Sequence, residues 1–204
     1  MHPCNLFVLF RFMLIMLFFA ACNETSKRKD DIIAADPASL QLLIKKNIRL
    51  QLNQANDHNG KLNDSLQLGF FRVLDHNYQL NDDNPVWSIN GKWTASTEGL
   101  IRFLTNSLED GLFREDYHFS GIQAIKSSLD EDSVKRMNAA LWSKADLLLT
   151  DAFMHLLQDL EQGRLQPDSL EWKNNKVKYD DFFANSLTRL KNGEIPDSIF
   201  KSVQ

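Results

Sequence analysis

The chain has 204 residues and a formal net charge of −4, with 23 Lys and Arg residues against 27 Asp and Glu residues. The basic residues are scattered rather than clustered, which argues against binding to nucleic acid. Both cysteines, Cys4 and Cys22, lie near the N-terminus, so the rest of the chain has no disulfide, thiolate metal site or cysteine nucleophile. Length and composition therefore predict one domain, or at most two small ones, stabilised by the core alone.

Residues 1–21 have the pattern of an export signal. Phe12–Ala21 is an uninterrupted apolar run, and Arg11 is the only charged residue before Glu24. Small residues precede Cys22, as they do at a signal cleavage site. The segment resembles the lipobox of bacterial lipoproteins. We therefore predict a lipoprotein-type signal peptide with Cys22 as the lipidated residue; an uncleaved signal anchor is the alternative.

A lipidated Cys22 would place the following chain in the cell envelope, facing the periplasm and anchored to a membrane by its lipid. Asn23 follows the anchor, and by resemblance to enterobacterial sorting it favours the outer membrane over the inner one. Residues 22–35 are polar and show no periodicity, so we predict a flexible tether there.

Helical patterns dominate after residue 35. Asp36 and Pro37 predict a helix start, because Asp is a favoured cap and Pro suits the first helical position. Apolar residues at helical spacing extend this helix to about Leu52, and residues 53–60 read as a loop. Residues 63–65 are predicted to cap a second helix.

A small hairpin and two more helices are expected next. Residues 86–93 fit a hairpin that turns at Asn90-Gly91. Thr94 begins a helix that Asp110-Gly111 ends, and Ser120 is predicted to cap a short one.

The longest predicted helix runs from about Asp132 to Gln162 and is stopped by Gly163. Its broad apolar stripe, with Leu149, Phe153 and Leu156 in the core, predicts a central helix that several others contact. A further helix is expected over Asp180–Lys191.

The predicted fold class is mainly α. A single helical domain over residues 36–195 would hold six or seven helices around one long central helix, with at most a minor β-hairpin. Residues 196–204 are predicted to begin a further, truncated helix at Pro196.

No catalytic residue, cofactor or metal site is predicted from residue types and spacing. We expect none of the five histidines to have a ligand-type partner on its own helix, and we expect His118, in a loop, to be structural or exposed. The carboxylates Glu98 and Asp110 suggest glycoside hydrolysis only weakly, because most acidic residues fall at helix caps and exposed faces.

Asp146 stands inside an apolar helical segment and shares a helix side with Thr150. A buried carboxylate needs a partner. The candidate cations are Arg72, Lys92, Arg102 and Arg164. We expect a buried polar network that fixes helix register rather than a catalytic group.

Several motifs together resemble the scaffold domain of large bacterial L,D-transpeptidases. One is the run 146–152 with the residues that follow it, a second is Tyr78 with Pro85-Val86-Trp87, and a third spans 109–118. The resemblance covers about residues 66–203. The residues that carry it are Tyr78, Pro85, Trp87, Gly111, Asp116, Tyr117, Asp146, Thr150, Gly163, Arg164, Pro167 and Trp172.

In that family the scaffold domain precedes a peptidoglycan-binding-like module and a catalytic domain whose cysteine attacks the donor stem peptide. This chain has no cysteine after Cys22, so none of the family's catalytic residues can be placed on it. The resemblance therefore implies a non-catalytic scaffold portion of an envelope L,D-transpeptidase-like protein involved in peptidoglycan cross-linking. Its expected partners are peptidoglycan or a separate or downstream catalytic domain.

Two other functions remain open. The chain fits a freestanding envelope lipoprotein that binds cell-wall material or a partner enzyme. It also fits an unrecognised enzyme that uses its carboxylates or His118.

Overall fold

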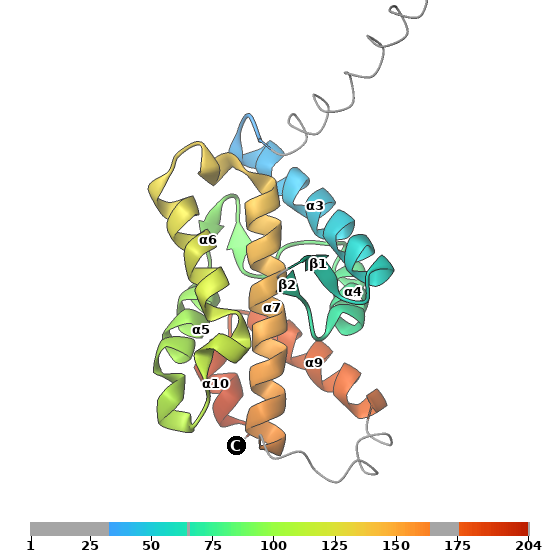
Figure 1. Ribbon diagram of the computed structural model, residues 1–204, viewed down its shortest axis with the longest axis vertical. Helices are drawn as coiled ribbons and strands as arrows, with labels where there is room; N and C mark the ends of the chain where they lie inside the picture. The colour runs from blue at the N-terminus through green and yellow to red at the C-terminus, as the bar shows by residue number, and fades with distance from the viewer. Residues whose placement is uncertain (1–32, 65, 164–175, 204) are drawn as a thin grey trace, which may run out of the picture.

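A computed structural model describes residues 33–64, 66–163 and 176–203. These residues form seven α-helices and two small two-stranded antiparallel sheets, which confirms the predicted mainly α fold. Figure 1 shows them arranged around α7 (Ala139–Gln162). The predicted signal peptide and most of the predicted tether lie outside the described residues, as do Cys22, Arg164, Pro167 and Trp172.

Helix α3 (Pro37–Asp57) begins where the sequence predicts. The Asp36 carboxylate accepts hydrogen bonds from the backbone N–H groups of Ala38 and Ser39, both at 2.9 Å. The helix continues through residues predicted to be a loop, and Ala55, which has no exposed surface, extends its buried face.

A hairpin replaces the predicted helix cap at residues 63–65. Strand β1 (Lys61–Asn63) pairs with β2 (Leu66–Gln67), and helix α4 (Phe71–Leu80) starts only afterwards. The backbone N–H groups of Gly69 and Phe70 are bound by a distant carboxylate, that of Asp151, instead of joining a helix. The helix start is thus set by a tertiary contact.

The second hairpin is present as predicted. Strand β3 (Ser88–Ile89) pairs with β4 (Lys92–Trp93). Asn90 and Gly91 both have positive φ, at 50° and 71°, as a two-residue turn between twisted strands requires.

Helix α5 (Ala95–Asn106) follows the second hairpin, capped by Thr94 as predicted. A 3₁₀ turn, η2 (Ser107–Asp110), extends it to Gly111, whose φ of 73° ends the segment. The predicted boundaries of this helix therefore hold.

The starts of α6 and α7 differ from prediction. Helix α6 (Phe119–Glu131) begins right after the short 3₁₀ turn η3 (Arg114–Tyr117) and His118, and Ser120 binds Glu115 instead of capping the helix. Residues 132–138 contain another 3₁₀ turn, η4 (Lys135–Met137). The Asn138 side chain then caps α7, accepting from two backbone N–H groups, so the predicted start at Asp132 is wrong.

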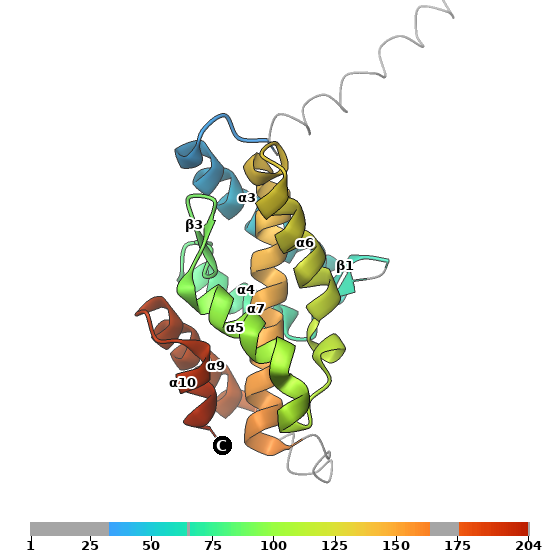
Figure 2. The ribbon, with the colours of Figure 1, turned by 90° about the vertical axis from the view of Figure 1, so that its left-hand side faces the viewer.

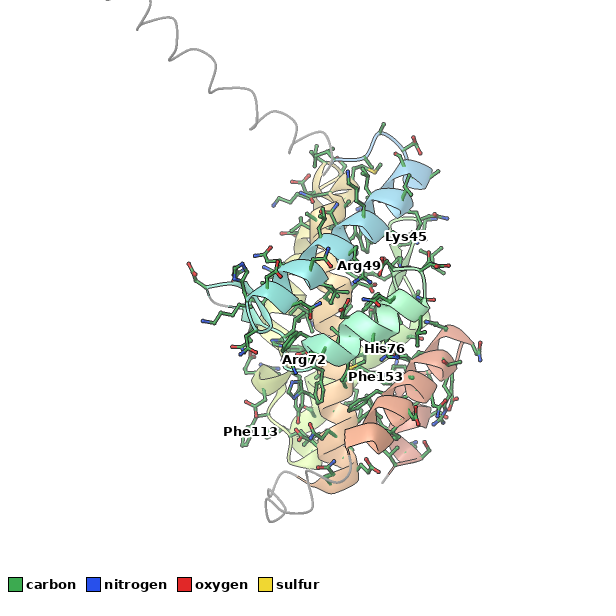
Figure 3. All side chains as sticks on the ribbon, turned by 90° about the vertical axis from the view of Figure 1, so that its right-hand side faces the viewer. Lys45, Arg49, Arg72, His76, Phe113 and Phe153 are labelled. Atoms are coloured by element: carbon green, nitrogen blue, oxygen red, sulfur yellow. The ribbon has the colours of Figure 1, made fainter. Side chains whose placement is uncertain are left out.

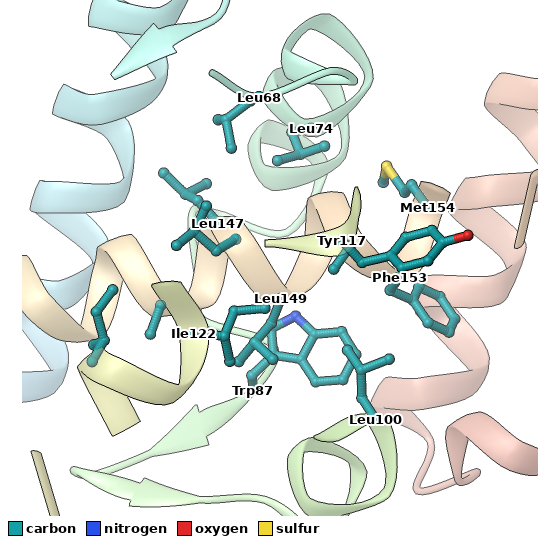
Figure 4. Packing of buried hydrophobic residues seen from close by; sticks show 14 of the residues in the cluster. Leu68, Leu74, Trp87, Leu100, Tyr117, Ile122, Leu147, Leu149, Phe153 and Met154 are labelled. Atoms are coloured by element: carbon teal, nitrogen blue, oxygen red, sulfur yellow. The ribbon is translucent and has the colours of Figure 1, made fainter. Parts of the chain in front are cut away.

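Helix α7 is central, as predicted: α3, α4, α5, α6 and α10 (Pro196–Lys201) all contact it. Leu149, Phe153 and Leu156 have no exposed surface. Figure 4 shows Leu149 and Phe153 in the core together with Trp87, whose ring lies edge-on to Phe153 with centroids 5.8 Å apart.

The two ends of the described chain lie at opposite poles of the domain (Figures 1 and 2). At the N-terminal pole the backbone N–H of Ala34 donates to Met137 O at 2.9 Å, so the last residues of the predicted tether contact the domain. At the opposite pole α10 follows α9 (Lys176–Lys191) and buries Ile199 and Phe200, so it packs into the same core as the preceding helices. No described helix combines the length and hydropathy that a membrane-spanning helix needs.

Candidate functional site

The carboxylate of Asp146, on α7, is buried and has several hydrogen-bond partners. It accepts hydrogen bonds from the backbone N–H groups of Val86 at 3.0 Å and Trp87 at 2.9 Å, and from the Tyr78 hydroxyl. Asp146 is 1% exposed and Tyr78 2%. We call Tyr78, Val86, Trp87, Asp146 and Thr150 the Asp146 clamp.

Thr150 completes the clamp one helical turn after Asp146. Its Oγ1 accepts from Trp87 Nε1 at 2.8 Å, lies 2.8 Å from the Tyr78 hydroxyl and donates to the Asp146 backbone carbonyl at 2.9 Å. The clamp therefore joins α4, the segment before β3 and α7 through buried polar contacts. The predicted buried network around Asp146 and Thr150 is present.

Three of the four candidate cations are not partners of Asp146, and the fourth, Arg164, lies outside the described residues. The bonds to Asp146 come from two backbone amides and a phenol rather than from Arg72, Lys92 or Arg102, and Arg102 instead pairs with Asp197 at 3.2 Å. Backbone amides leave no trace in the amino-acid type, which is why the sequence suggested a cation.

Burial decides the ionisation of the clamp. Desolvation raises the pKa of Asp146 from 3.8 to about 6, although its three donors favour the charged form. Burial and then the neighbouring Asp146 charge raise the pKa of Tyr78 well above its usual value. The hydroxyl therefore stays protonated and can donate to the carboxylate.

Five residues after Asp146, a second buried carboxylate on α7 anchors another loop. Asp151 accepts from the backbone N–H groups of Gly69 at 3.1 Å and Phe70 at 2.8 Å, and its Oδ2 lies 2.8 Å from His118 Nε2. His155 Nε2 lies 3.6 Å from the same oxygen. We call these five residues the Asp151 cluster.

This cluster was not predicted from the sequence. His118 has a partner, and His155 lies four residues after Asp151 on one helix, so the expectation that no histidine has a ligand-type partner on its own helix is wrong. The i, i+4 spacing of Asp151 and His155 was the available signal. The partner of His118 is Asp151, 33 residues away, and no sequence pattern connects the two residues.

In the Asp151 cluster the carboxylate holds two backbone amides and the His118 ring in fixed orientations. Asp151 has no exposed side-chain surface, whereas His118 and His155 retain 19% and 33%. Burial lowers the pKa of His155. Within the described part of the chain, no group of three or more His, Cys, Asp or Glu side chains is arranged to hold a metal ion.

The carboxylates Glu98 and Asp110 do not form a pair. Glu98 lies in the first turn of α5 and contacts Lys126 at 3.2 Å, while Asp110 ends η2 beyond the other end of that helix. At 1.5 Å per helical residue the two are separated by about 18 Å, well beyond the spacing glycoside hydrolysis uses.

The remaining described residues of the resemblance take structural positions. Asp116 and Tyr117 lie in η3; Tyr117 is buried, and its hydroxyl donates to Asp159 Oδ2 at 2.6 Å. Gly163, with a φ of 74°, ends α7. Pro85 immediately precedes the two amides that Asp146 binds.

Comparison with known families decides the identity of the fold. A family model described as the scaffold domain matches residues 72–204, more than half of the chain. The chain belongs to the scaffold-domain family. No curated protein and no solved structure matches it.

The matched scaffold-domain range begins inside α4 and contains the whole Asp146 clamp. The Asp151 cluster, in contrast, takes Gly69 and Phe70 from just outside that range. Helix α3, also outside it, is held to α4 and the turn after it by Arg49, which binds Asp75 and Asp83. Figure 3 shows Arg49 on α3 where the two helices pass each other.

Proposed function

We propose that this scaffold domain is the non-catalytic scaffold portion of an envelope L,D-transpeptidase-like protein that takes part in peptidoglycan cross-linking. The observation that carries the proposal is the Asp146 clamp. Its members Tyr78, Trp87, Asp146 and Thr150 come from three separate segments, and all four belong to the set that resembles transpeptidase scaffold domains.

The chain's own residues support a non-catalytic role. Peptide transfer by this family's chemistry needs a thiolate that can be acylated and released. Residues 23–204 contain no cysteine. Ser143, which precedes Lys144, accepts from Gln51 Nε2 at 2.6 Å and donates to the Ala140 carbonyl, so neither bond supplies a base that would activate it.

The proposal includes a location. Cys22 would carry the lipid anchor, with the domain facing the periplasm and the outer membrane favoured over the inner one. This placement is supported by the order of three features along the chain: an apolar run, then small residues, then Cys22. A freestanding module that binds cell-wall material or a partner enzyme is the alternative function.

The first test is muropeptide analysis of cells that lack the gene. Loss of a scaffold portion should lower the fraction of L,D-type cross-links, and expression of the intact chain should restore it. An unchanged fraction would contradict a role in cross-linking. A frame with a Ser/Thr-His-Gly-Cys motif directly downstream would favour the scaffold portion over the freestanding module.

The second test addresses catalysis and location. The purified chain, incubated with tetrapeptide muropeptides and an acceptor amine, should form no cross-linked product and no covalent carbapenem adduct by intact mass. Either product would show that the chain is an enzyme. The Cys22→Ser variant should leave the membrane fraction; a variant that still pellets with membranes would refute the lipid anchor.

A further inference from the structure

Exposed aliphatic side chains gather at the N-terminal pole. Ile33, Leu42, Ile89 and Val134 are 42%, 68%, 61% and 67% exposed, and they come from four separate segments. Isolated apolar side chains are common on any surface, whereas several at one end of a domain mark an interaction surface.

Contacts across the pole hold these segments next to one another. Ile33 pairs with Asn138, just after the η4 turn that follows Val134. The backbone N–H of Asn90, beside Ile89, donates to Gln41 Oε1 at 2.9 Å, beside Leu42. The four aliphatic residues therefore lie on chain segments that meet at this end of the domain.

A partly apolar hollow of about 480 Å³ connects the segments of this surface. Pro37, Leu40, Trp93, Met137 and Trp142 supply most of its apolar lining. The rings of Trp93 and Trp142 lie 4.4 Å apart between centroids, and Trp93 Nε1 donates to Asp130. The two packed rings therefore form part of the wall of this hollow.

Charges of both signs surround the aliphatic side chains. The charged residues near them in the described sequence are Asp36, Lys45, Lys46, Lys92, Glu131, Asp132, Lys135 and Arg136. Lys135 lies 3.9 Å from Asp132, while Lys126 pairs with Asp130 beneath. Five of these residues are basic and three are acidic, so their net charge is only +2, and we expect attraction to a partner to come mainly from the apolar side chains.

Chain length places this pole close to the proposed lipid anchor. Cys22 and Ile33 are separated by so few residues that a fully extended chain spans at most about 40 Å. A tether of that length would hold the N-terminal pole near the membrane surface at an effective concentration on the order of millimolar. A few aliphatic side chains that would bind a bilayer too weakly on their own then suffice.

We propose that the N-terminal pole is a lipid-docking face, on which Ile33, Leu42, Ile89 and Val134 enter the boundary between headgroups and acyl chains of the membrane that carries the anchor. The inference rests on the proposed lipidation of Cys22. It predicts a docked domain with its long axis steep to the membrane and α10 at the distal end.

Single labelled cysteines test the proposal, because the mature chain has no free thiol. Leu42→Cys, Ile89→Cys and Val134→Cys would each carry an environment-sensitive fluorophore on the full lipidated chain in phosphatidylethanolamine–phosphatidylglycerol vesicles. Leu80→Cys and Leu108→Cys, at 71% and 70% exposure, are matched controls away from the pole. Headgroup-proximal doxyl lipids should quench the first three labels and leave the controls unquenched, in low and high salt alike.

A double variant, Ile89→Asp with Val134→Asp, should abolish quenching of the label at position 42, whereas Leu108→Asp should leave it intact. Equal quenching at all positions, or none, would overturn the docking face. A blue shift at the pole without doxyl quenching would indicate a protein partner or second copy and would also overturn it. Intact mass separates the two proposals: a chain without diacylglyceryl mass refutes both, and a lipidated, unquenched chain refutes only this one.

Discussion

Asp146 and Asp151 stand five residues apart on α7 and solve the same problem in different surroundings. Each is buried, and each accepts from two consecutive backbone N–H groups of a segment that precedes another element. Asp146 adds a buried phenol and threonine, whereas Asp151 adds two histidines that reach solvent. One helix thus fixes two chain segments. The Asp146 clamp is closed to solvent and is called the dry site below. The Asp151 cluster, whose histidines are partly exposed, is called the wet site.

The largest effect should come from breaking the dry site. Asp146→Ala leaves the amides of Val86 and Trp87 and the Tyr78 hydroxyl without their acceptor, so we expect unfolding to become easier by about 4 kcal/mol. Chemical denaturation measures it. Asp57→Ala, on the exposed end of α3, is the control. A loss below about 1 kcal/mol would mean that water enters the clamp and replaces the carboxylate.

An apolar substitution on the same helix gives a reference value for the stability lost by the aspartate substitutions. Leu156 has no exposed surface, and Leu156→Ala should cost about 3 kcal/mol through lost burial and the cavity it leaves. Denaturant midpoints at constant slope give the value. A cost under about 0.5 kcal/mol, typical of surface changes, would place Leu156 outside the core.

The dry site should also respond to pH. The folded pKa of Asp146, about 6, is above its usual 3.8, so its contribution is fully present below about 3.8 and is lost as pH rises through about 6. Lowering the pH from 7 to 4 should therefore add at most about 3 kcal/mol from this group.

Other groups oppose that trend. The pKa of His155 is lowered by burial, and those of Asp36 and Asp75 are also lowered. The contribution of these three residues to the stability of the fold therefore falls in acid. The measurement is therefore the difference in the free energy of unfolding between the parent chain and Asp146→Asn from pH 7 to pH 4. Parallel stability curves for the two proteins would show that Asp146 does not titrate there.

The wet site should yield a smaller loss. Asp151→Ala leaves the amides of Gly69 and Phe70 without their acceptor, but partly exposed His118 and His155 lie beside water that can replace the carboxylate. We expect about 2 kcal/mol. The same denaturation series measures it, and a cost equal to that of Asp146→Ala would remove the distinction between the two sites.

Features decided by neighbouring residues were predictable from sequence. The Asp36 cap, the Asn90-Gly91 turn, the Thr94 cap and the Gly111 stop each depend on chemistry within a few residues. The central apolar helix was predictable because its stripe is long and regular.

Features decided by distant partners were not predictable. The turn before α4 is held by Asp151, 82 residues after Gly69, which binds its amides. Asp146 was recognised as a group that needs partners, yet its donors are main-chain groups that any residue carries. Side-chain identity therefore predicted the buried network at two of the five clamp residues, Asp146 and Thr150, and did not predict the Asp151 cluster.

The contact between Ala34 and Met137 makes α7 a spacer. Ala34 joins the domain just before the start of that helix, and α7 then runs through its centre to Gly163 at the opposite pole. Its 24 residues amount to a rod of about 36 Å. If the domain is held by lipid at the N-terminal pole, as proposed above, this rod would set the distance between the membrane and Gly163.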